Sequence, residues 1–281
     1  SHSRFMQKTN PSAFGINNMN KTGVLYNSQG LINNNRIESQ YFFGAISFDQ
    51  DNFSLGLDVY SLTMDNTGLV NTKPRLSYIY KIQFDNDVYF LPSITLGLGS
   101  SRFDPSKLIF EDQISLVSGF LQTESQDPIV DQIGNSNYMD LGASFIVHSS
   151  NYLFGLSIQH LNQPNISYNN EDTDYTLPIR VSAQGGYEFD INPYDRSIMP
   201  RYSTVYAFMN LSKIGDNYDI YLSQEAQLGS FSVGLNQQFR KTSSFGFTNI
   251  GLSIALAYEN FEFGALYNFP FRSPMNTTVY S

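Results

Sequence analysis

The chain has no cysteine and no tryptophan, and charged residues make up only 15% of its 281 residues. The absence of cysteine excludes disulfides, thiolate metal sites and thiol nucleophiles. Ordinary soluble domains carry roughly 25% charged residues, so the charge content is low for a protein whose whole surface meets water. No stretch approaches the roughly 18 apolar residues that a membrane-spanning helix requires. The net charge of -9 argues against nucleic acid as a partner, because phosphates are bound by Lys and Arg.

Aromatic residues, in contrast, are abundant. The chain contains 23 Phe and 19 Tyr, and hydrophobic residues reach 41%. Tyr and Phe are typical of the aromatic girdles that lie at the two interfaces of an outer-membrane barrel. A barrel with an apolar outer belt and a polar interior needs few surface charges, so this composition favours one.

Alternation of apolar and polar residues with a period of two is the strongest pattern in the chain. In residues 249–258, Ile, Leu, Ile, Leu and Tyr alternate with Asn, Gly, Ser, Ala and Ala. Successive side chains of a strand point to opposite faces, so one face is apolar and the other small or polar. The alternation recurs in residues 54–59, 75–82, 93–99, 139–147 and 154–159. Because the polar face carries few Lys and Glu, it predicts a wet, crowded interior, and the apolar face is predicted to meet lipid.

Strands are predicted near residues 21–28, 39–49, 54–65, 73–84, 88–100, 137–148, 152–160, 178–189, 201–210, 217–227, 231–240, 247–258 and 261–269, with a last one from about 277. Short connections alternate with long ones such as residues 30–36, 101–136, 161–177 and 241–246; residues 191–200 and 215–217 are exceptions. Outer-membrane barrels have short periplasmic turns and longer extracellular loops. We therefore predict an all-β fold, a transmembrane antiparallel β-barrel of about 14 strands with a periplasmic N-terminus and long extracellular loops.

Two parts of the chain differ in character. Residues 1–20 are polar and have no strand pattern, so we interpret them as an N-terminal periplasmic or plug segment. Residues 21–281 form the predicted transmembrane β-barrel, which includes the long loop 101–136. No signal peptide precedes Ser1 and no closing strand with a terminal aromatic ends the chain, so we expect both termini to be incomplete.

Several short motifs resemble, in the same order, those of one known family. The motifs are SHSRFM and NPSAFG at residues 1–6 and 10–15, LIFEDQI at 108–114, YMDLGA at 138–143, GLS and HLNQP at 155–157 and 160–164, and LPIR and GGY at 177–180 and 185–187. Together they resemble the PorP/SprF family of the Bacteroidetes type IX secretion system. The chain departs from the family pattern at residues 26–29, which lack the expected Arg and Trp.

The resemblance implies a non-enzymatic component of the type IX secretion and gliding apparatus in the bacterial outer membrane. Such a protein would bind and anchor a secreted surface protein through the C-terminal domain of that adhesin. Its partner could instead be a periplasmic or outer-membrane subunit of the secretion machine, and outer-membrane lipid would surround it. The alternative interpretation is an outer-membrane transporter or channel for small solutes of the fatty-acid-transport barrel type. The sequence leaves open the identity of the partner and the choice between motility and general secretion.

Two places are candidates for partner binding. A loop as long as residues 101–136 usually folds over something or binds something, and its candidates are Phe110, Asp112, Gln113, Ile114 and Phe120. The second place is the exit of a predicted strand, with His160, Gln163 and Pro164.

Charged residues on the predicted inner faces form a third set: Asp58, Arg75, Lys81, Asp140, Arg180 and Glu225, together with Glu188, Arg240 and Glu262. Such groups would cost several kcal/mol if they faced lipid near the midplane. Both signs are present, so we predict a lumen that is crossed by ion pairs and largely closed.

No catalytic, metal or cofactor site is predicted. Ser144 and His148 share a strand face but lie about 13 Å apart at the rise of a strand, which is too far for proton transfer. The three His residues have no metal-ligand spacing with carboxylates. The acidic residues 171–174 and 190–195 lack the ligand spacing of an EF-hand and are interpreted as solvated loops.

Overall fold

The computed structural model describes residues 4–18, 20–30, 36–48, 50–65, 67–85, 87–104, 135–167, 175–194, 199–201, 203–241 and 245–270. Two short 3-10 helices come first, η1 (Met6–Lys8) and η2 (Pro11–Asn18). The strands are β1 (Lys21–Gly30), β2 (Arg36–Phe48), β3 (Phe53–Met64), β4 (Leu69–Tyr80), β5 (Ile82–Asp85), β6 (Val88–Arg102), β7 (Ser136–His148), β8 (Tyr152–Gln159), β9 (Arg180–Asp190), β10 (Thr204–Ile214), β11 (Asn217–Leu228), β12 (Phe231–Lys241), β13 (Phe245–Tyr258) and β14 (Phe261–Pro270).

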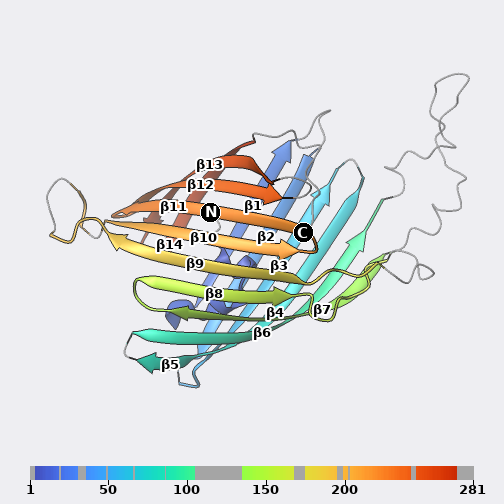
Figure 1. The fold of residues 1–281 in the computed structure, drawn as a ribbon, viewed down its shortest axis with the longest axis horizontal. Helices are drawn as coiled ribbons and strands as arrows, with labels where there is room; N and C mark the ends of the chain where they lie inside the picture. Colours follow the sequence, from blue (N-terminus) through green and yellow to red (C-terminus); the bar gives the residue numbers. More distant parts are fainter. Residues whose placement is uncertain are drawn as a thin grey trace, which may run out of the picture.

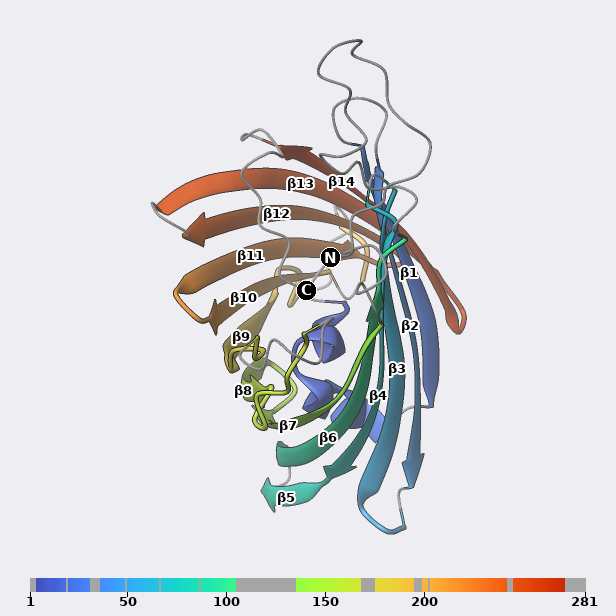
Figure 2. The same ribbon diagram turned by 90° about the vertical axis from the view of Figure 1, so that its right-hand side faces the viewer.

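All strands belong to one 14-stranded sheet in which strands pair in sequence order, except that β4 pairs with β6 and not with β5. Every pairing is antiparallel, and β5 pairs with β6 beside the main path. The sheet curls, and the N-terminal helices lie within its curve (Figures 1 and 2). The predicted all-β antiparallel architecture is confirmed. None of the helices in the described ranges is long and apolar enough to cross a bilayer.

Two strands differ clearly from their predicted bounds. The strand expected at residues 73–84 is interrupted at Lys81, and its first part starts earlier, at Leu69. β10 runs to Ile214 because Gly215, at φ 55°, allows a tight reversal that pairs Ile214 with Asn217. This φ lies in the left-handed region that glycine adopts without steric cost. The strand expected from residue 277 lies outside the described residues.

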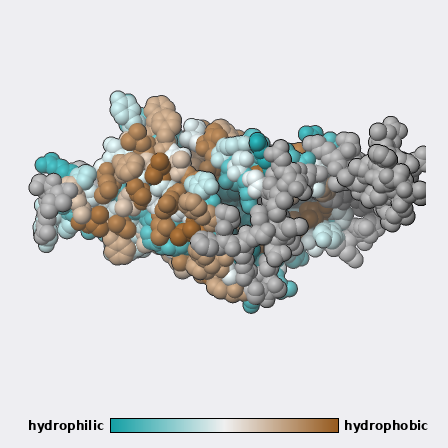
Figure 3. Space-filling model, turned by 90° about the horizontal axis from the view of Figure 1, so that it is seen from above, coloured by the Kyte–Doolittle hydropathy of each residue, from teal (hydrophilic) through white to brown (hydrophobic). Residues whose placement is uncertain are grey.

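The two faces of the sheet have the polarity that the alternation predicted. In β13, Leu252, Ile254 and Leu256 are each more than half exposed, whereas Ser253 and Ala255 are buried. A soluble sheet would bury the Leu and Ile side chains and expose the Ser. Apolar side chains accordingly gather over a broad part of the outer surface (Figure 3). This arrangement, with an apolar outer face, is typical of a membrane barrel wall.

The apolar core lies on the concave face, beneath the N-terminal segment. Ala13 and Phe14 of η2 pack there with a group of buried residues from the sheet: Tyr41, Phe43, Ala45, Ile79, Leu91, Ile146 and Leu153. These sheet residues come from β2, β4, β6, β7 and β8. The N-terminal segment is therefore part of the folded core and not an appendage.

Candidate functional site on the concave face

Residues 4–18, which we call the docked segment, fold into two tight turns instead of a strand. The backbone N–H of Asn10 donates to the carbonyl of Met6 (2.8 Å), and that of Ala13 donates to the carbonyl of Asn10 (3.1 Å). The Asn10 side-chain oxygen accepts from the N–H of Ser12 (3.1 Å). Asn and Ser side chains favour such local turns. Some of the backbone polar groups of these turns thus find partners within the segment.

Asn10 and Ser12 attach the docked segment to β6, β7 and β8. The Asn10 Nδ2 donates to the carbonyls of Phe145 (3.1 Å) and Leu156 (3.3 Å). The Ser12 Oγ lies 2.9 Å from the Oγ of both Ser93 and Ser144. Both Asn10 and Ser12 are fully buried. Buried polar groups are costly unless they are hydrogen-bonded, so these contacts specify where the segment docks.

Phe14 fills a hole that a glycine leaves in the sheet. A Cβ added to Gly56 would lie 2.2 Å from the Phe14 Cδ2, which no real side chain could tolerate. The Phe14 ring is 0% exposed, and its centroid lies 6.1 Å from that of Phe43. Glycine inside a strand often marks such a close approach. The missing side chain of Gly56 therefore leaves the space that Phe14 of the docked segment fills.

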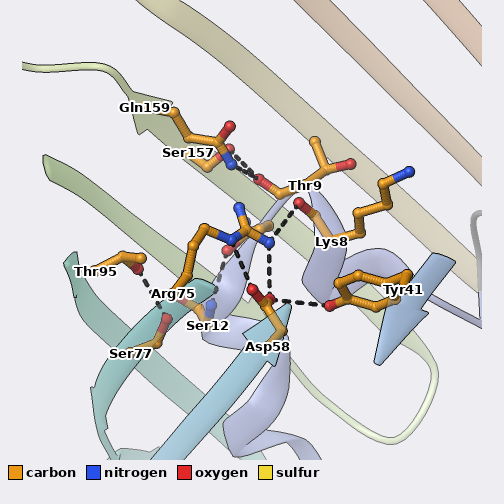
Figure 4. Close-up of polar contacts among 11 residues, drawn as sticks. Lys8, Thr9, Ser12, Tyr41, Asp58, Arg75, Ser77, Thr95, Ser157 and Gln159 are labelled. Carbon is orange, nitrogen blue, oxygen red and sulfur yellow. Dashed lines mark hydrogen bonds and ion pairs between the residues drawn. The ribbon is translucent and has the colours of Figure 1, made fainter. Parts of the chain in front are cut away.

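The predicted inward charges Asp58 and Arg75 meet as register partners on β3 and β4. The Arg75 Nε and Nη2 donate to the two Asp58 oxygens at 2.8 Å each, and the Tyr41 hydroxyl donates to Asp58 Oδ2 (3.0 Å). Arg75 Nη2 also donates to the carbonyl of Lys8 (3.0 Å), as Figure 4 shows. A bidentate Arg–carboxylate pair is geometrically specific. This pair therefore holds the backbone of the docked segment in one place.

Two side chains of β8 hold the next backbone carbonyl of the docked segment. The Ser157 Oγ and the Gln159 Nε2 both donate to the carbonyl of Thr9, at 2.8 and 3.0 Å. The two successive carbonyls of Lys8 and Thr9 are thus held from different strands (Figure 4). Contacts of this kind depend on the backbone conformation of the segment and not on the identity of its side chains.

The other end of the docked segment reaches the far part of the sheet. Arg4 forms ion pairs with Glu225 of β11 and Glu262 of β14, and its Nη2 donates to the Ser232 Oγ of β12 (2.6 Å). The segment therefore connects β3 to β8 with β11 to β14 across the concave face. Of the predicted inward charges, Glu225 and Glu262 meet here.

The remaining predicted inward charges form separate contacts. Asp140 accepts from or donates to His160 Nδ1 at 2.9 Å, depending on their protons, and Arg240 Nε donates to Asp219 (2.6 Å). The Lys81 Nζ lies 4.5 Å from the centre of the Tyr89 ring. Arg180 lies within electrostatic range of Arg75, Arg240 and Asp219.

The predicted rim residues after β8 have unequal accessibility. His160 adopts φ 61° and is 5% exposed, so its ring turns inward to Asp140. Burial lowers the pKa of His160, and the Asp140 carboxylate opposes this shift. Pro164 is buried, whereas Gln163 is exposed. A role of these three residues in partner binding stays a prediction, and Phe110, Asp112, Gln113, Ile114 and Phe120 lie outside the described residues.

The Asn162 side chain bonds to the backbone of β7 just beyond the point where β8 ends. Its side-chain oxygen accepts from the N–H of Leu141 (3.0 Å), and its Nδ2 donates to the carbonyl of Met139 (2.6 Å). The amide thereby makes the pair of bonds that another strand residue would make. The rim at residues 160–167 is held in a defined shape, with a bridge between Asn165 and Thr176.

Ser144 and His148, which share a strand face, contact different residues. The hydroxyl of Ser144 bonds to those of Ser12 and Ser93, and the ring of His148 stacks on Tyr89 at 5.4 Å. In the part of the chain that the structure describes, no three His, Asp or Glu side chains gather as metal ligands would.

Sequence reasoning missed the residues that position the docked segment. Tyr41, Asn10, Ser12, Phe14 and Gly56 were not among the predicted site residues. The signal that could have found Asn10, Ser12 and Phe14 is the NPSAFG motif at residues 10–15, in which one aromatic residue stands among small and polar ones in a segment without strand pattern.

A family model described as type IX secretion system membrane protein PorP/SprF matches residues 4–279. The match covers the docked segment and all strands of the sheet. The comparison with curated proteins finds no match.

Proposed function

Since the chain belongs to the PorP/SprF family of type IX secretion system membrane proteins, we propose that it is a non-enzymatic outer-membrane barrel that binds and anchors another protein of that system. The bound protein is a secreted surface adhesin, held by its C-terminal domain, or a periplasmic or outer-membrane subunit of the machine. The observation that carries this proposal is the docked segment, which occupies the concave face and is held at Arg4 and at the Lys8 carbonyl.

The outer face supports a place in a membrane. Large apolar side chains are exposed on strands around the sheet, for example Ile94 at 66%, Leu98 at 58% and Phe263 at 68%. In water this much exposed apolar surface would drive association. In this proposal outer-membrane lipid covers it, with the N-terminus periplasmic and the long connections extracellular.

The packing inside the curved sheet supports an anchoring function rather than transport of solutes. A solute pathway needs a wet passage, whereas here Phe14, Asn10 and Ser12 are fully buried between the segment and the sheet. In this proposal residues 1–20 plug the barrel formed by residues 21–281. A surface adhesin would then dock at the rim of the long connections, through the predicted binding loop 101–136 and the exposed Gln163, and would not pass through the lumen.

Purification of the full chain from native outer membrane after mild cross-linking tests this function. We expect a large surface protein or a secretion-machine subunit at a stoichiometric level. The same chain, reconstituted alone into planar bilayers, should show no steady conductance. Sustained solute flux through the isolated chain, with no protein attached in the membrane, would favour the fatty-acid-transport type of barrel instead.

A further inference from the structure

Two lysines and a tyrosine lie side by side on the outer face of the sheet, at the rim of the long connections. In the pairing register, Lys213 of β10 lies opposite Tyr218 of β11, and Tyr218 lies opposite Lys241 of β12. All three are exposed, and β10 and β12 both end at this edge of the sheet (Figure 1). The next residues along β11 and β12, Asp219 and Arg240, pair on the concave face, so the three residues lie on the opposite, outer face. We call them the Lys–Tyr–Lys row.

The two ammonium groups of the row converge on one aromatic ring. The Lys213 Nζ lies 5.3 Å and the Lys241 Nζ lies 5.7 Å from the centre of the Tyr218 ring. Both distances are within the roughly 6 Å over which an aromatic face attracts a cation. No carboxylate in the described part of the chain forms an ion pair with either lysine, although the exposed Asp216 lies in the turn that joins β10 to β11. Two like charges thus share one place on the surface, where an anion between them would lower their repulsion.

Apolar side chains border the row on the outer face. Two residues further along each strand, about 7 Å away at the rise of a strand, the register brings together Leu211, Ile220 and Phe239. On the neighbouring strands β9 and β13, the exposed Val181 and Phe245 lie opposite the two lysines. The outer face therefore changes from apolar to cationic within one step of the strand pleat. Basic and aromatic side chains gather in this way where a chain leaves the bilayer, so the row belongs at the level of the lipid headgroups.

We propose that the Lys–Tyr–Lys row binds the phosphate group of a membrane-lipid headgroup, whose acyl chains lie along the apolar side chains next to the row. Each ammonium group offers three donors and the tyrosine hydroxyl a fourth kind of contact, and lysine binds phosphate as a point charge. The row opens towards the lipid and not towards the concave face, which favours a lipid phosphate over a soluble anion. This inference rests on the membrane placement in the proposed function and is independent of the anchoring of a partner.

Two other exposed basic residues at the same rim provide a matched control. Arg36 begins β2 and Arg102 ends β6, and β3 and β4 lie between these two strands. The two arginines therefore carry the same total charge as the two lysines but do not converge on one place. If the summed charge of the rim attracted anionic lipid, loss of either pair would have the same effect. If the row is a site, only loss of the lysines matters.

Because the chain has no tryptophan, Phe245→Trp places a single fluorescent reporter opposite Lys241. The full chain with this substitution is reconstituted in phosphatidylcholine vesicles that contain a minor fraction of phosphatidic acid with brominated acyl chains, which quench tryptophan on contact; the comparison uses the same fraction of brominated phosphatidylcholine. Quenching should show at least about fivefold stronger binding of phosphatidic acid, since each basic residue near an anionic lipid contributes about fivefold. K213Q/K241Q should abolish this preference, K213R/K241R should keep it, and R36Q/R102Q should leave it unchanged.

Four results would overturn the lipid site: no preference in the reporter chain, the same preference in K213Q/K241Q, an equal loss in R36Q/R102Q, or loss of the preference when inorganic phosphate is added, which would make the row a site for free anions. Retention of the folded band on unheated gels shows that a variant is folded. K241Q alone should weaken the preference and serves if the double variant fails to fold. Quenching by neither brominated lipid would contradict the membrane placement itself. A preference for phosphatidic acid without any co-purified partner keeps the lipid site and rejects the anchor, whereas a partner without the preference does the reverse.

Discussion

Asp58 accepts hydrogen bonds from two nitrogens of Arg75 and from the Tyr41 hydroxyl while only 1% of it is exposed. A buried carboxylate is stable only while its hydrogen-bond and ion-pair partners remain in contact with it. The same Arg75 also holds the Lys8 carbonyl. One buried ion pair therefore couples the pairing of β3 with β4 to the docking of the N-terminal segment.

We expect Asp58→Asn to lower the free energy of unfolding by about 3 kcal/mol, because it leaves the Arg75 guanidinium buried without its counter-charge. The matched control is Asp219→Asn, which breaks the half-buried pair with Arg240 and should cost about 1 kcal/mol or less. Urea titration of the chain folded in phospholipid bilayers, read by the band shift on unheated gels, measures both. Equal losses would show that Asp58 is not specially constrained.

The burial of His160 leads to a prediction of how the stability of the protein depends on pH. Burial keeps its folded pKa below the ordinary 6.5, while Asp140 opposes the shift. Because the unfolded chain takes up the proton first, stability is full above about pH 6.5 and falls as the pH drops from there towards the folded pKa. Asp140→Asn should lower the pKa of His160 further, since it removes the opposing charge. Histidine-selective NMR of the chain in micelles checks this, and a rise on Asp140→Asn would contradict it.

Among the elements, the docked segment depends on a glycine in a strand that it does not adjoin in sequence. Gly56→Ala should displace the segment, because the added methyl group would lie 2.2 Å from Phe14. The chain has no native cysteine, so a single Ala13→Cys substitution reports on the segment through its rate of maleimide labelling. We expect labelling at least about tenfold faster with Gly56→Ala, in line with a loss of more than 1.4 kcal/mol of docking energy.

Gly185→Ala is the control for this experiment, since a Cβ there would meet nothing within 4 Å. It should leave the labelling rate unchanged. Adding Phe14→Ala to Gly56→Ala removes the clash but also the anchor, so fast labelling should persist. Slow labelling of the Gly56→Ala variant would mean that the segment docks without the space at Gly56.

The strands were predictable because the alternation of residues 249–258 and of the other segments reports directly on which side chains share a face. Their exact ends were not, because turns such as the one at Gly215 depend on a backbone conformation that the pattern does not carry. The cost of facing lipid is a physical reason to expect charges on the polar face of a strand, but it does not say how they pair. Register fixes Asp58 opposite Arg75, whereas the contact of Arg4 with Glu225 joins positions 221 residues apart.

At the scale of the molecule, the described strands form a single curved sheet whose polar face lies inside the curve. The side chains that a soluble protein would bury, such as Leu252 and Ile254, are exposed at 53% each, and the smallest polar ones, such as Ser223, are fully buried. Among the described residues, the apolar core inside that curve forms where the docked segment packs against the sheet. The fold is therefore consistent as a unit only if another apolar medium covers the outer face.

The apolar outer face predicts a penalty for charge that depends on depth. Leu252 lies in the middle of β13 (Phe245–Tyr258), whereas Tyr258 ends that strand on the same face. Leu252→Arg should destabilise the chain folded in phospholipid bilayers by about 2–4 kcal/mol, because the charge would lie near the midplane, and Tyr258→Arg by about 1 kcal/mol or less, because it would lie at the interface. Urea titration in vesicles measures the difference. Equal penalties at the two positions, or a chain that dissolves as a folded monomer without detergent, would contradict a lipid-facing outer surface, because in water the cost of an exposed arginine does not depend on its place along a strand.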